Sequence, residues 1–224
     1  MIKAVLWDID GTLLNFKKAQ YEALYKCFGY FNEYLNDEMV NDYDHINHGY
    51  WLMLEKGEIE KSVLLIKRFT DFFSKYGIDI DPIEFNKLYQ VELGNTYVFN
   101  DNGYETVVGL KDMGIIQFAV TNGTKVAQNG KLKGSGLDKL LDEIFISEDI
   151  GYEKPDKRFF EPVIDKLGEY GISKDECIIV GDSESSDIQG GINAGIRTVH
   201  YTNELKSKAD ELISDLSMVL AMVQ

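Results

Sequence analysis

Short apolar runs separated by long helical stretches constrain the fold of this chain more than any other feature. Five runs stand out, and four of them lead directly into polar residues: Ala4–Trp7, Ile115–Val120, Glu143–Ile146, Cys177–Val180 and Arg197–Tyr201. Nearly unbroken apolar runs are typical of strands that are buried on both faces of a parallel sheet. We therefore expect an α/β fold in which right-handed crossovers join parallel strands.

The segments between these runs show the period of helices. Phe160, Val163, Ile164 and Leu167 follow the i, i+3, i+4, i+7 pattern, and Pro155 lies near the expected start of that helix. The other predicted crossover helices are Gly103–Met113, Lys125–Lys133 and Asp187–Ala194.

Residues 16–97 differ from the rest, because they hold amphipathic helical patterns and no convincing buried strand. The patterns lie at Tyr21–Phe28, Met39–Glu55, Leu65–Tyr76 and Pro82–Leu93. We predict a four-helix insertion between the first two strands of the sheet. The chain then divides into a core of residues 1–15 and 98–224 and a cap of residues 16–97.

Polar residues follow the predicted strands where an α/β sheet forms its ligand crevice, outside the carboxyl ends of the strands. The first such group is Asp8-Ile9-Asp10-Gly11-Thr12. Residues two apart on a strand share a direction, so Asp8 and Asp10 project together. One carboxylate could act as a nucleophile and the other as an acid/base, with a metal reducing their repulsion. Taken alone, the group also fits a solvated turn.

Three further groups follow later strands. Thr121-Asn122-Gly123 could donate hydrogen bonds to phosphate oxygens, and the lysine of Lys154-Pro155-Asp156 could neutralise a phosphate. The stretch Gly181–Asp187 carries the carboxylate and hydroxyl oxygens that Mg²⁺ prefers. Separately, these groups also fit a plain turn, a surface lysine and an ordinary helix cap.

Together and in this order, the four groups resemble the haloacid dehalogenase-like (HAD) phosphohydrolase superfamily. Asp8-x-Asp10-Gly-Thr resembles its first motif, Thr121 its second, Lys154 its third and Gly181-Asp182-x-x-x-x-Asp187 its fourth. The resemblance covers nearly the whole chain. It implies a Rossmann-like three-layer core with a parallel sheet, and the helical insertion resembles the family's C1-type cap.

The resemblance also implies a role for each motif residue. Asp8 would attack phosphorus to form an aspartyl-phosphate, while Asp10 would act as acid and then as base. Thr121, Asn122 and Lys154 would bind the phosphoryl group. Asp8, the backbone carbonyl of Asp10 and Asp182 would hold Mg²⁺, and Asp187 would lie behind these ligands.

The carboxylate at Asp10 favours a phosphatase over a dehalogenase, because displacement of halide needs no acid. In the cap, Asn47-x-x-x-Trp51, Gly57-x-Ile59 and Arg68-Phe69 resemble the house-cleaning pyrimidine 5′-nucleotidases. We therefore expect a nucleoside monophosphate as substrate, with Asn47, Trp51 and Arg68 as candidate contacts. Sugar-phosphate or phosphoglycolate phosphatases and phosphomutases remain alternatives on the same scaffold, and a non-catalytic binding module is a further one.

The net charge and the two cysteines limit the partners and the cellular location that we expect for the protein. The formal net charge of −15 argues against nucleic-acid polymers and anionic membranes as partners, but it does not identify a substrate. The family resemblance implies a small phosphorylated metabolite as the partner. Neither a signal peptide nor a membrane span is expected. Cys27 and Cys177 are expected as buried thiols rather than a disulfide, which indicates the cytoplasm. A monomer or a homodimer is expected.

Overall fold

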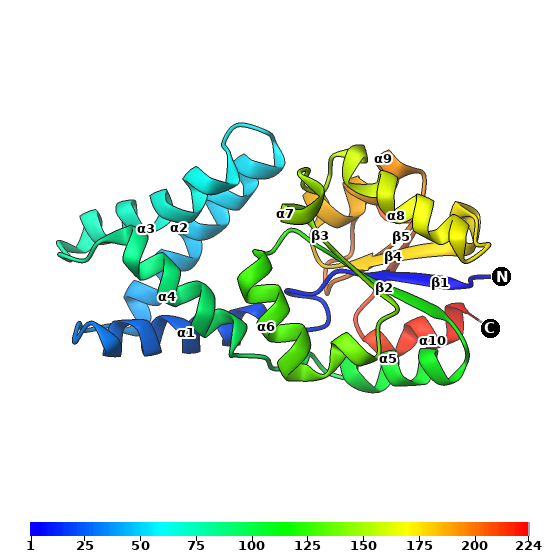
Figure 1. Cartoon of the computed structure of the whole chain (residues 1–224), viewed down its shortest axis with the longest axis horizontal. Helices are drawn as coiled ribbons and strands as arrows, with labels where there is room; N and C mark the ends of the chain where they lie inside the picture. The colour runs from blue at the N-terminus through cyan, green and yellow to red at the C-terminus, as the bar shows by residue number, and fades with distance from the viewer. Residues whose placement is uncertain (224) are drawn as a thin grey trace.

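The computed structural model describes residues 1–223 and shows two lobes side by side (Figure 1). One lobe holds a six-stranded sheet in the order β3-β2-β1-β4-β5-β6, with every neighbouring pair parallel. The strands are β1 (Ala4–Trp7), β2 (Ile116–Thr121), β3 (Glu143–Ile146), β4 (Cys177–Gly181), β5 (Arg197–Tyr201) and β6 (Glu211–Ile213). The five predicted strands are confirmed, and β6 is an additional, three-residue edge strand.

Helices cover both faces of the sheet and make a three-layer core (Figure 1). They are α5 (Gly103–Asp112), α6 (Lys125–Ser135), α7 (Ser147–Ile150), α8 (Lys157–Glu169), α9 (Gln189–Ala194) and α10 (Val219–Met222). Two apolar clusters fill the layers. One joins Trp7 of β1 to Val107 of α5 and Val219 of α10, and the other joins Phe118 of β2 to Phe160 of α8. The predicted α/β, Rossmann-like class is confirmed.

The start of the helix predicted at Asp187 differs from the expectation. Residues Glu184–Ile188 form a wide π-helical turn, and α9 begins only at Gln189. The side chain of Ser183 accepts a hydrogen bond from the Ser186 amide, and the Ser183 amide donates to Asp187 Oδ2. The wide turn therefore directs the Asp187 carboxylate back toward the end of β4.

Four helices form the second lobe, as the amphipathic patterns predict: α1 (Phe16–Tyr30), α2 (Asp37–Glu55), α3 (Lys61–Tyr76) and α4 (Pro82–Gly94). The side chains of Asn15, Asn36 and Asp81 cap three of these helices at their N-termini. Aromatic side chains fill the interior, where Phe69 stacks on Tyr43 with ring centroids 5.1 Å apart. We call this lobe the cap.

The carboxyl ends of the strands point toward the cap, and both chain termini lie at the opposite end of the core (Figure 1). The two segments that join the lobes are bound to each other. The Asn15 amide donates to the Val98 carbonyl at 2.7 Å, and Asn100 Nδ2 donates to the carbonyls of Gly11 and Thr12 at 2.9 and 2.8 Å. The cap is thus tethered directly beside the loop that follows β1.

Helix α6 lies between the two lobes and packs closely against α4 of the cap. A Cβ atom on Gly130 would lie only 2.7 Å from the carbonyl oxygen of Gly94, so the two backbones approach too closely for any larger residue.

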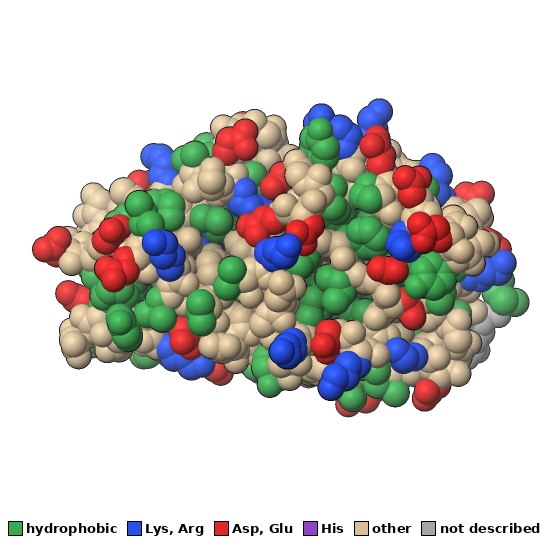
Figure 2. All heavy atoms as spheres, viewed as in Figure 1, with side chains coloured by type: hydrophobic (Ala, Val, Ile, Leu, Met, Phe, Trp, Pro, Cys, Tyr) green, Lys and Arg blue, Asp and Glu red, His purple; other side chains and the backbone are tan. Residues whose placement is uncertain are grey.

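Acidic and basic side chains are interspersed over both lobes (Figure 2). Among the helices within residues 1–223, none combines the length and the apolar character that crossing a membrane requires.

Candidate active site

The predicted site residues meet at the carboxyl edge of the sheet because their strands are neighbours there. Asp8 follows β1, Thr121 ends β2 and Asp182 follows β4, and these three strands lie side by side in the order β2-β1-β4. The Asp8 amide donates to the Val180 carbonyl at 2.9 Å, which fixes the start of the loop after β1. This edge is where α/β sheets bind ligands.

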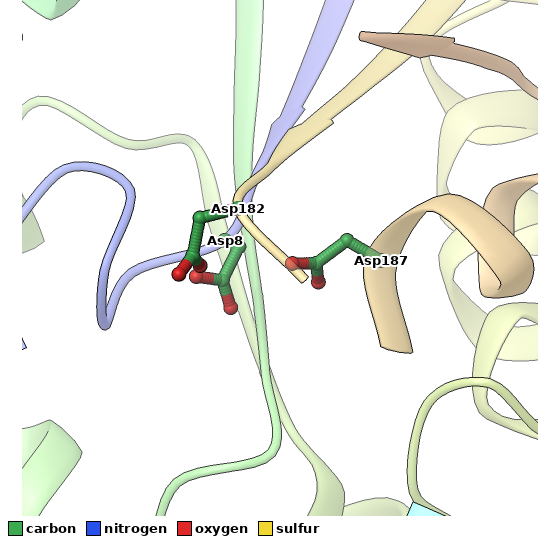
Figure 3. A group of neighbouring side chains, drawn as sticks. All are labelled: Asp8, Asp182 and Asp187. Carbon is green, nitrogen blue, oxygen red and sulfur yellow. The ribbon is translucent and has the colours of Figure 1, made fainter. Parts of the chain in front are cut away.

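Three carboxylates form the centre of the site (Figure 3). Oxygens of Asp8, Asp182 and Asp187 lie within 4.8 Å of one another. Asp8 and Asp182 extend from the ends of β1 and β4, and Asp187 faces them from the π-helical turn. Asp8 and Asp187 are buried, whereas Asp182 opens onto the cleft. Thr12 Oγ1 lies between two of them, 3.1 Å from Asp8 Oδ2 and 3.3 Å from Asp182 Oδ1.

Gly11 is required by this arrangement. Its φ of +100° lies in the region that favours glycine, and a Cβ atom there would lie 2.3 Å from Asp182 Oδ2. Because Gly11 has no side chain, the Asp182 carboxylate can lie directly against the loop that carries Asp8.

Lys154 provides the central cation of the site and is 1% exposed. Its Nζ donates to Asp187 Oδ1 at 2.6 Å, to Asp8 Oδ1 at 2.9 Å and to the Val120 carbonyl at 2.6 Å. The other oxygen of Asp187 accepts from the Ser183 amide at 3.0 Å. Because both oxygens of Asp187 already have partners, this residue is placed to orient Lys154.

The charges of these groups are strongly coupled. Burial, followed by repulsion from Asp187, raises the pKa of Asp8 well above its usual range, although Lys154 opposes the shift. Restricted contact with bulk water in the cleft, followed by the charge of Asp187, raises the pKa of Asp182 to about 7. Burial alone would lower the pKa of Lys154, but Asp187 and Asp8 outweigh it and raise that pKa above its ordinary value.

This cluster fits a magnesium ion. Three carboxylates face one another with one lysine among them, so negative charge is in excess. Hard carboxylate oxygens are the ligands that Mg²⁺ prefers, and a divalent cation would relieve the repulsion that raises the pKa of Asp8.

The predicted phosphate-binding residues surround a small cavity of about 160 Å³ that also includes Asp8 and Asp10. Thr121 Oγ1 accepts a hydrogen bond from the Gly123 amide at 3.0 Å. The Asn122 side chain makes two hydrogen bonds to the Lys154 backbone. Its Nδ2 donates to the Lys154 carbonyl and its Oδ1 accepts from the Lys154 amide, both at 2.8 Å. Asn122 therefore fixes the backbone from which the Lys154 side chain extends.

The small cavity adjoins a larger one of about 840 Å³ between the core and the cap. Asn47 and Trp51 line the larger cavity, as does Phe16. Arg68 lines neither cavity. It is buried in the cap, where it donates to Asn47 Oδ1 at 2.8 Å, so its link to the cavity runs through Asn47.

Helix α6 brings two side chains to Asp10 that the sequence did not single out. Gln128 Nε2 donates to Asp10 Oδ2 at 2.6 Å, and Lys131 Nζ forms an ion pair with Asp10 Oδ1. Both are fully buried. Their spacing of three residues places them on one face of a helix, but that spacing alone does not show which way the face turns.

Further unpredicted contacts join the cap to the core. Lys61 Nζ donates to Ser147 Oγ at 2.5 Å and lies 3.3 Å from Glu153, and Ser185 donates to Glu55 at 2.5 Å. Burial lowers the pKa of Lys61 and raises that of Glu55. These contacts hold the cap against the rim of the site.

His200, at the end of β5, supports the loop of Asp182 and was also missed. Its Nε2 lies 2.9 Å from the Asp182 carbonyl, which can only accept, so Nε2 carries the proton. The sequence pattern marked His200 only as part of a strand.

Comparison with known proteins agrees with this geometry. The HAD-hydrolase YfnB of Bacillus subtilis is 30% identical over 211 residues, which cover 94% of this chain and 88% of YfnB. The pyrimidine 5′-nucleotidase PynA of Streptococcus pneumoniae is 34% identical over 206 residues, covering 89% and 83% of the two chains. Other relatives are named as a glyceraldehyde 3-phosphate phosphatase and a pyrophosphatase.

A solved structure gives the same result. The crystal structure of Bacillus subtilis YfnB bound to magnesium superposes with a TM-score of 0.92 at 29% identity, covering 99% of this chain and 98% of YfnB. The family described as haloacid dehalogenase-like hydrolase matches residues 2–195. With the motifs, the fold and the carboxylate cluster in agreement, the chain belongs to the haloacid dehalogenase-like hydrolases.

Proposed function

We propose that this protein is a magnesium-dependent phosphomonoesterase that works through an aspartyl-phosphate. One observation carries the proposal: Asp8 lies beside the buried cation of Lys154 and lines a small cavity that adjoins a larger one under the cap. A phosphoryl group in the small cavity would meet the nucleophile, while the rest of the substrate extended into the larger cavity.

The reaction has two steps. A carboxylate oxygen of Asp8 attacks phosphorus, the bond between phosphorus and the leaving oxygen breaks, and Asp10 gives its proton to that oxygen. Water then attacks phosphorus, Asp10 takes a proton from the water, and the bond to Asp8 breaks to release phosphate. Because one carboxylate alternates between acid and base, no further titrating group is needed.

The chain's own residues supply positioning and charge neutralisation, on which phosphoryl transfer chiefly depends. Lys154 and Thr121 would bind phosphoryl oxygens, and Asn122 would hold the Lys154 backbone in place. Mg²⁺, held by Asp8, Asp182 and the Asp10 carbonyl, would neutralise phosphoryl charge when bound. Asp187 would orient Lys154 from behind.

For the substrate, we propose pyrimidine nucleoside 5′-monophosphates. The name of PynA supports this class, and the larger cavity has the aromatic rings of Phe16 and Trp51 beside the polar side chain of Asn47. Aromatic faces suit a base, and polar groups suit a sugar and the base edges. Closure of the cap would exclude water from the first step.

The test is phosphate release from a panel of compounds, with magnesium and with EDTA. The panel holds uridine, thymidine and adenosine 5′-monophosphates, glyceraldehyde 3-phosphate, phosphoglycolate and pyrophosphate. We expect the highest kcat/KM for the pyrimidine nucleotides, and only with magnesium. Preference for a sugar phosphate, for phosphoglycolate or for pyrophosphate would replace the nucleotide assignment. Rearranged rather than hydrolysed phosphate would indicate a mutase, and no turnover of any compound would indicate a binding module.

Three further expectations belong to this proposal. Core residues 1–15 and 98–224 and cap residues 16–97 form two structural units, which limited proteolysis at the two tethers would test. A cytoplasmic location fits the free, buried thiols of Cys27 and Cys177. The protein is a monomer or a homodimer, which sedimentation would decide.

A further inference from the structure

Asp10 is held by helix α6, independently of the cluster around Lys154. Gln128 Nε2 donates to one oxygen of its carboxylate and Lys131 Nζ binds the other. Donors on both oxygens fix the plane of a carboxylate as well as its position. The partners come from a helix about 120 residues further along the chain, so the contact is a product of the tertiary fold.

The surroundings of Lys131 indicate that its buried ammonium group serves to bind the Asp10 carboxylate. The side chain is fully buried, and within residues 1–223 Asp10 is its sole ion-pair partner. Its Nζ lies 5.3 Å from the centroid of the Phe16 ring, at the first residue of the cap. Buried lysines are uncommon in proteins, because removal of the ammonium from water is costly unless an anion compensates it.

Gln128 likewise has a hydrogen-bond partner at only one end of its side-chain amide, and that partner is Asp10. Its Nε2 donates to Asp10, whereas its buried Oε1 accepts no hydrogen bond from the residues that the structure describes. A glutamine kept only to stabilise a helix contact would be expected to use both ends of its amide. The polar function of this buried side chain is therefore the bond to Asp10.

Asp10 lines both cavities, so it stands where the small cavity meets the larger one. In the proposed reaction, the oxygen that leaves phosphorus must lie at this boundary, because the phosphoryl group and the rest of the substrate occupy different cavities. A free carboxylate on the loop after β1 would sample several rotamers there. The two bonds from α6 select one.

We propose that Lys131 and Gln128 are positioning residues that hold the Asp10 carboxylate at the boundary of the two cavities for proton transfer. This inference rests on the proposed phosphatase function. The steps affected are the transfer of a proton from Asp10 to the leaving oxygen as its bond to phosphorus breaks, and the later transfer of a proton from water to Asp10. When the leaving group needs no proton, the bond from Asp8 to phosphorus forms without help from either residue.

The experiment compares two substrates that differ in their need for an acid. p-Nitrophenyl phosphate releases a stable anion that needs no proton, whereas uridine 5′-monophosphate releases an alkoxide that does. The test variant is Lys131→Met. The control is Lys133→Met, an exposed lysine on the same helix, and Lys131→Arg restores the charge. Stopped-flow absorbance follows nitrophenolate, and steady-state phosphate release follows both substrates.

We expect Lys131→Met to form about one equivalent of nitrophenolate per folded enzyme at the wild-type rate, then to turn over at least about tenfold more slowly, since base catalysis of the second step is impaired. With uridine 5′-monophosphate, kcat should fall by at least about tenfold with no such burst, and KM should change by less than about twofold. Lys133→Met should match the wild type, and Lys131→Arg should recover part of the loss.

A Lys131→Met variant that slows the nitrophenolate burst as much as the turnover of uridine 5′-monophosphate would overturn the inference, because its defect would then lie in the whole site. So would a variant equal to Lys133→Met. If the wild type releases phosphate from neither substrate, the proposed function itself fails. Should Lys131→Met not fold, as judged by circular dichroism, Gln128→Met removes the other bond at similar volume and must give the same pattern.

Discussion

The contact between α4 and α6 predicts an unusual response to a common stabilising substitution. Replacing glycine with alanine inside a helix normally gains about 1 kcal/mol, because alanine loses less backbone entropy on folding. We expect Gly49→Ala in α2 to show this gain, since no atom lies within 4 Å of the position its Cβ would take. Gly130→Ala in α6 should lose stability instead.

The magnitude follows from the geometry at Gly130. A Cβ there would lie 2.7 Å from the Gly94 carbonyl oxygen and 2.9 Å from the Gly94 Cα, and backbone atoms cannot rotate away. The helices would have to separate by roughly 0.7 Å to restore ordinary contact. Overpacking of this kind costs about 1–3 kcal/mol. Set against the gain of about 1 kcal/mol, the net loss is roughly 0–2 kcal/mol, so the two variants should differ by about 1–3 kcal/mol.

Urea unfolding followed by tryptophan fluorescence measures this difference. At an m-value of about 2 kcal/mol/M, the midpoint of Gly130→Ala should lie about 0.5–1.5 M below that of Gly49→Ala. Because α6 also carries Gln128 and Lys131, Gly130→Ala should lower phosphatase turnover, whereas Gly49→Ala should leave it unchanged. Equal stabilisation by both substitutions would refute the tight helix crossing.

Further predictions concern the charged residues. Asp8→Asn should abolish turnover with an unchanged circular dichroism spectrum, and turnover above about a hundredth of the wild-type rate would refute the nucleophile assignment. In EDTA, the melting temperature should fall as the pH rises from about 5 to about 7. The raised pKa values of Asp8 and Asp182 let the folded state keep protons that the unfolded chain has already lost. Calorimetry should show a smaller fall for Asp182→Asn, and the same fall in both proteins would contradict this reasoning. Lys154→Met should cost about 3–5 kcal/mol in urea unfolding, because Asp8 loses its buried cation, and a loss below about 1 kcal/mol would contradict it. Arg68→Met should raise KM more than it lowers kcat, because Arg68 reaches the cavity only through Asn47, and an unchanged KM would show that this link is not needed.

The parts of the fold and site that the sequence predicted depend on local signals. Asp8, Thr121 and Asp182 follow apolar runs, and in a parallel sheet such runs place their carboxyl ends at one edge. The strand β6 was missed because its three residues give too short a pattern to distinguish from a loop.

The sequence did not single out Gln128 and Lys131, because the proposed roles of these residues depend on where the tertiary fold places them. A lysine in a helix ordinarily lies on the solvated face, so nothing in the sequence distinguished the buried Lys131 from the exposed Lys133. Arg68 shows the reverse case, because its motif suggested a substrate contact, whereas the structure turns its side chain into the cap behind Asn47. Which face a helix turns inward is decided by its neighbours.

The two tethers of the cap lie directly beside the loop of Asp8, so a rotation of the cap about them would turn around a point next to the site. Helix α1 starts at the tether with Phe16 and runs for 15 residues, a length of about 22 Å. A rotation of about 10° about the bonded tethers would carry the far end of α1 by about 4 Å but would move Phe16 by less than about 1 Å. A rotation of the cap about these tethers would therefore leave Phe16, beside Lys131, almost in place.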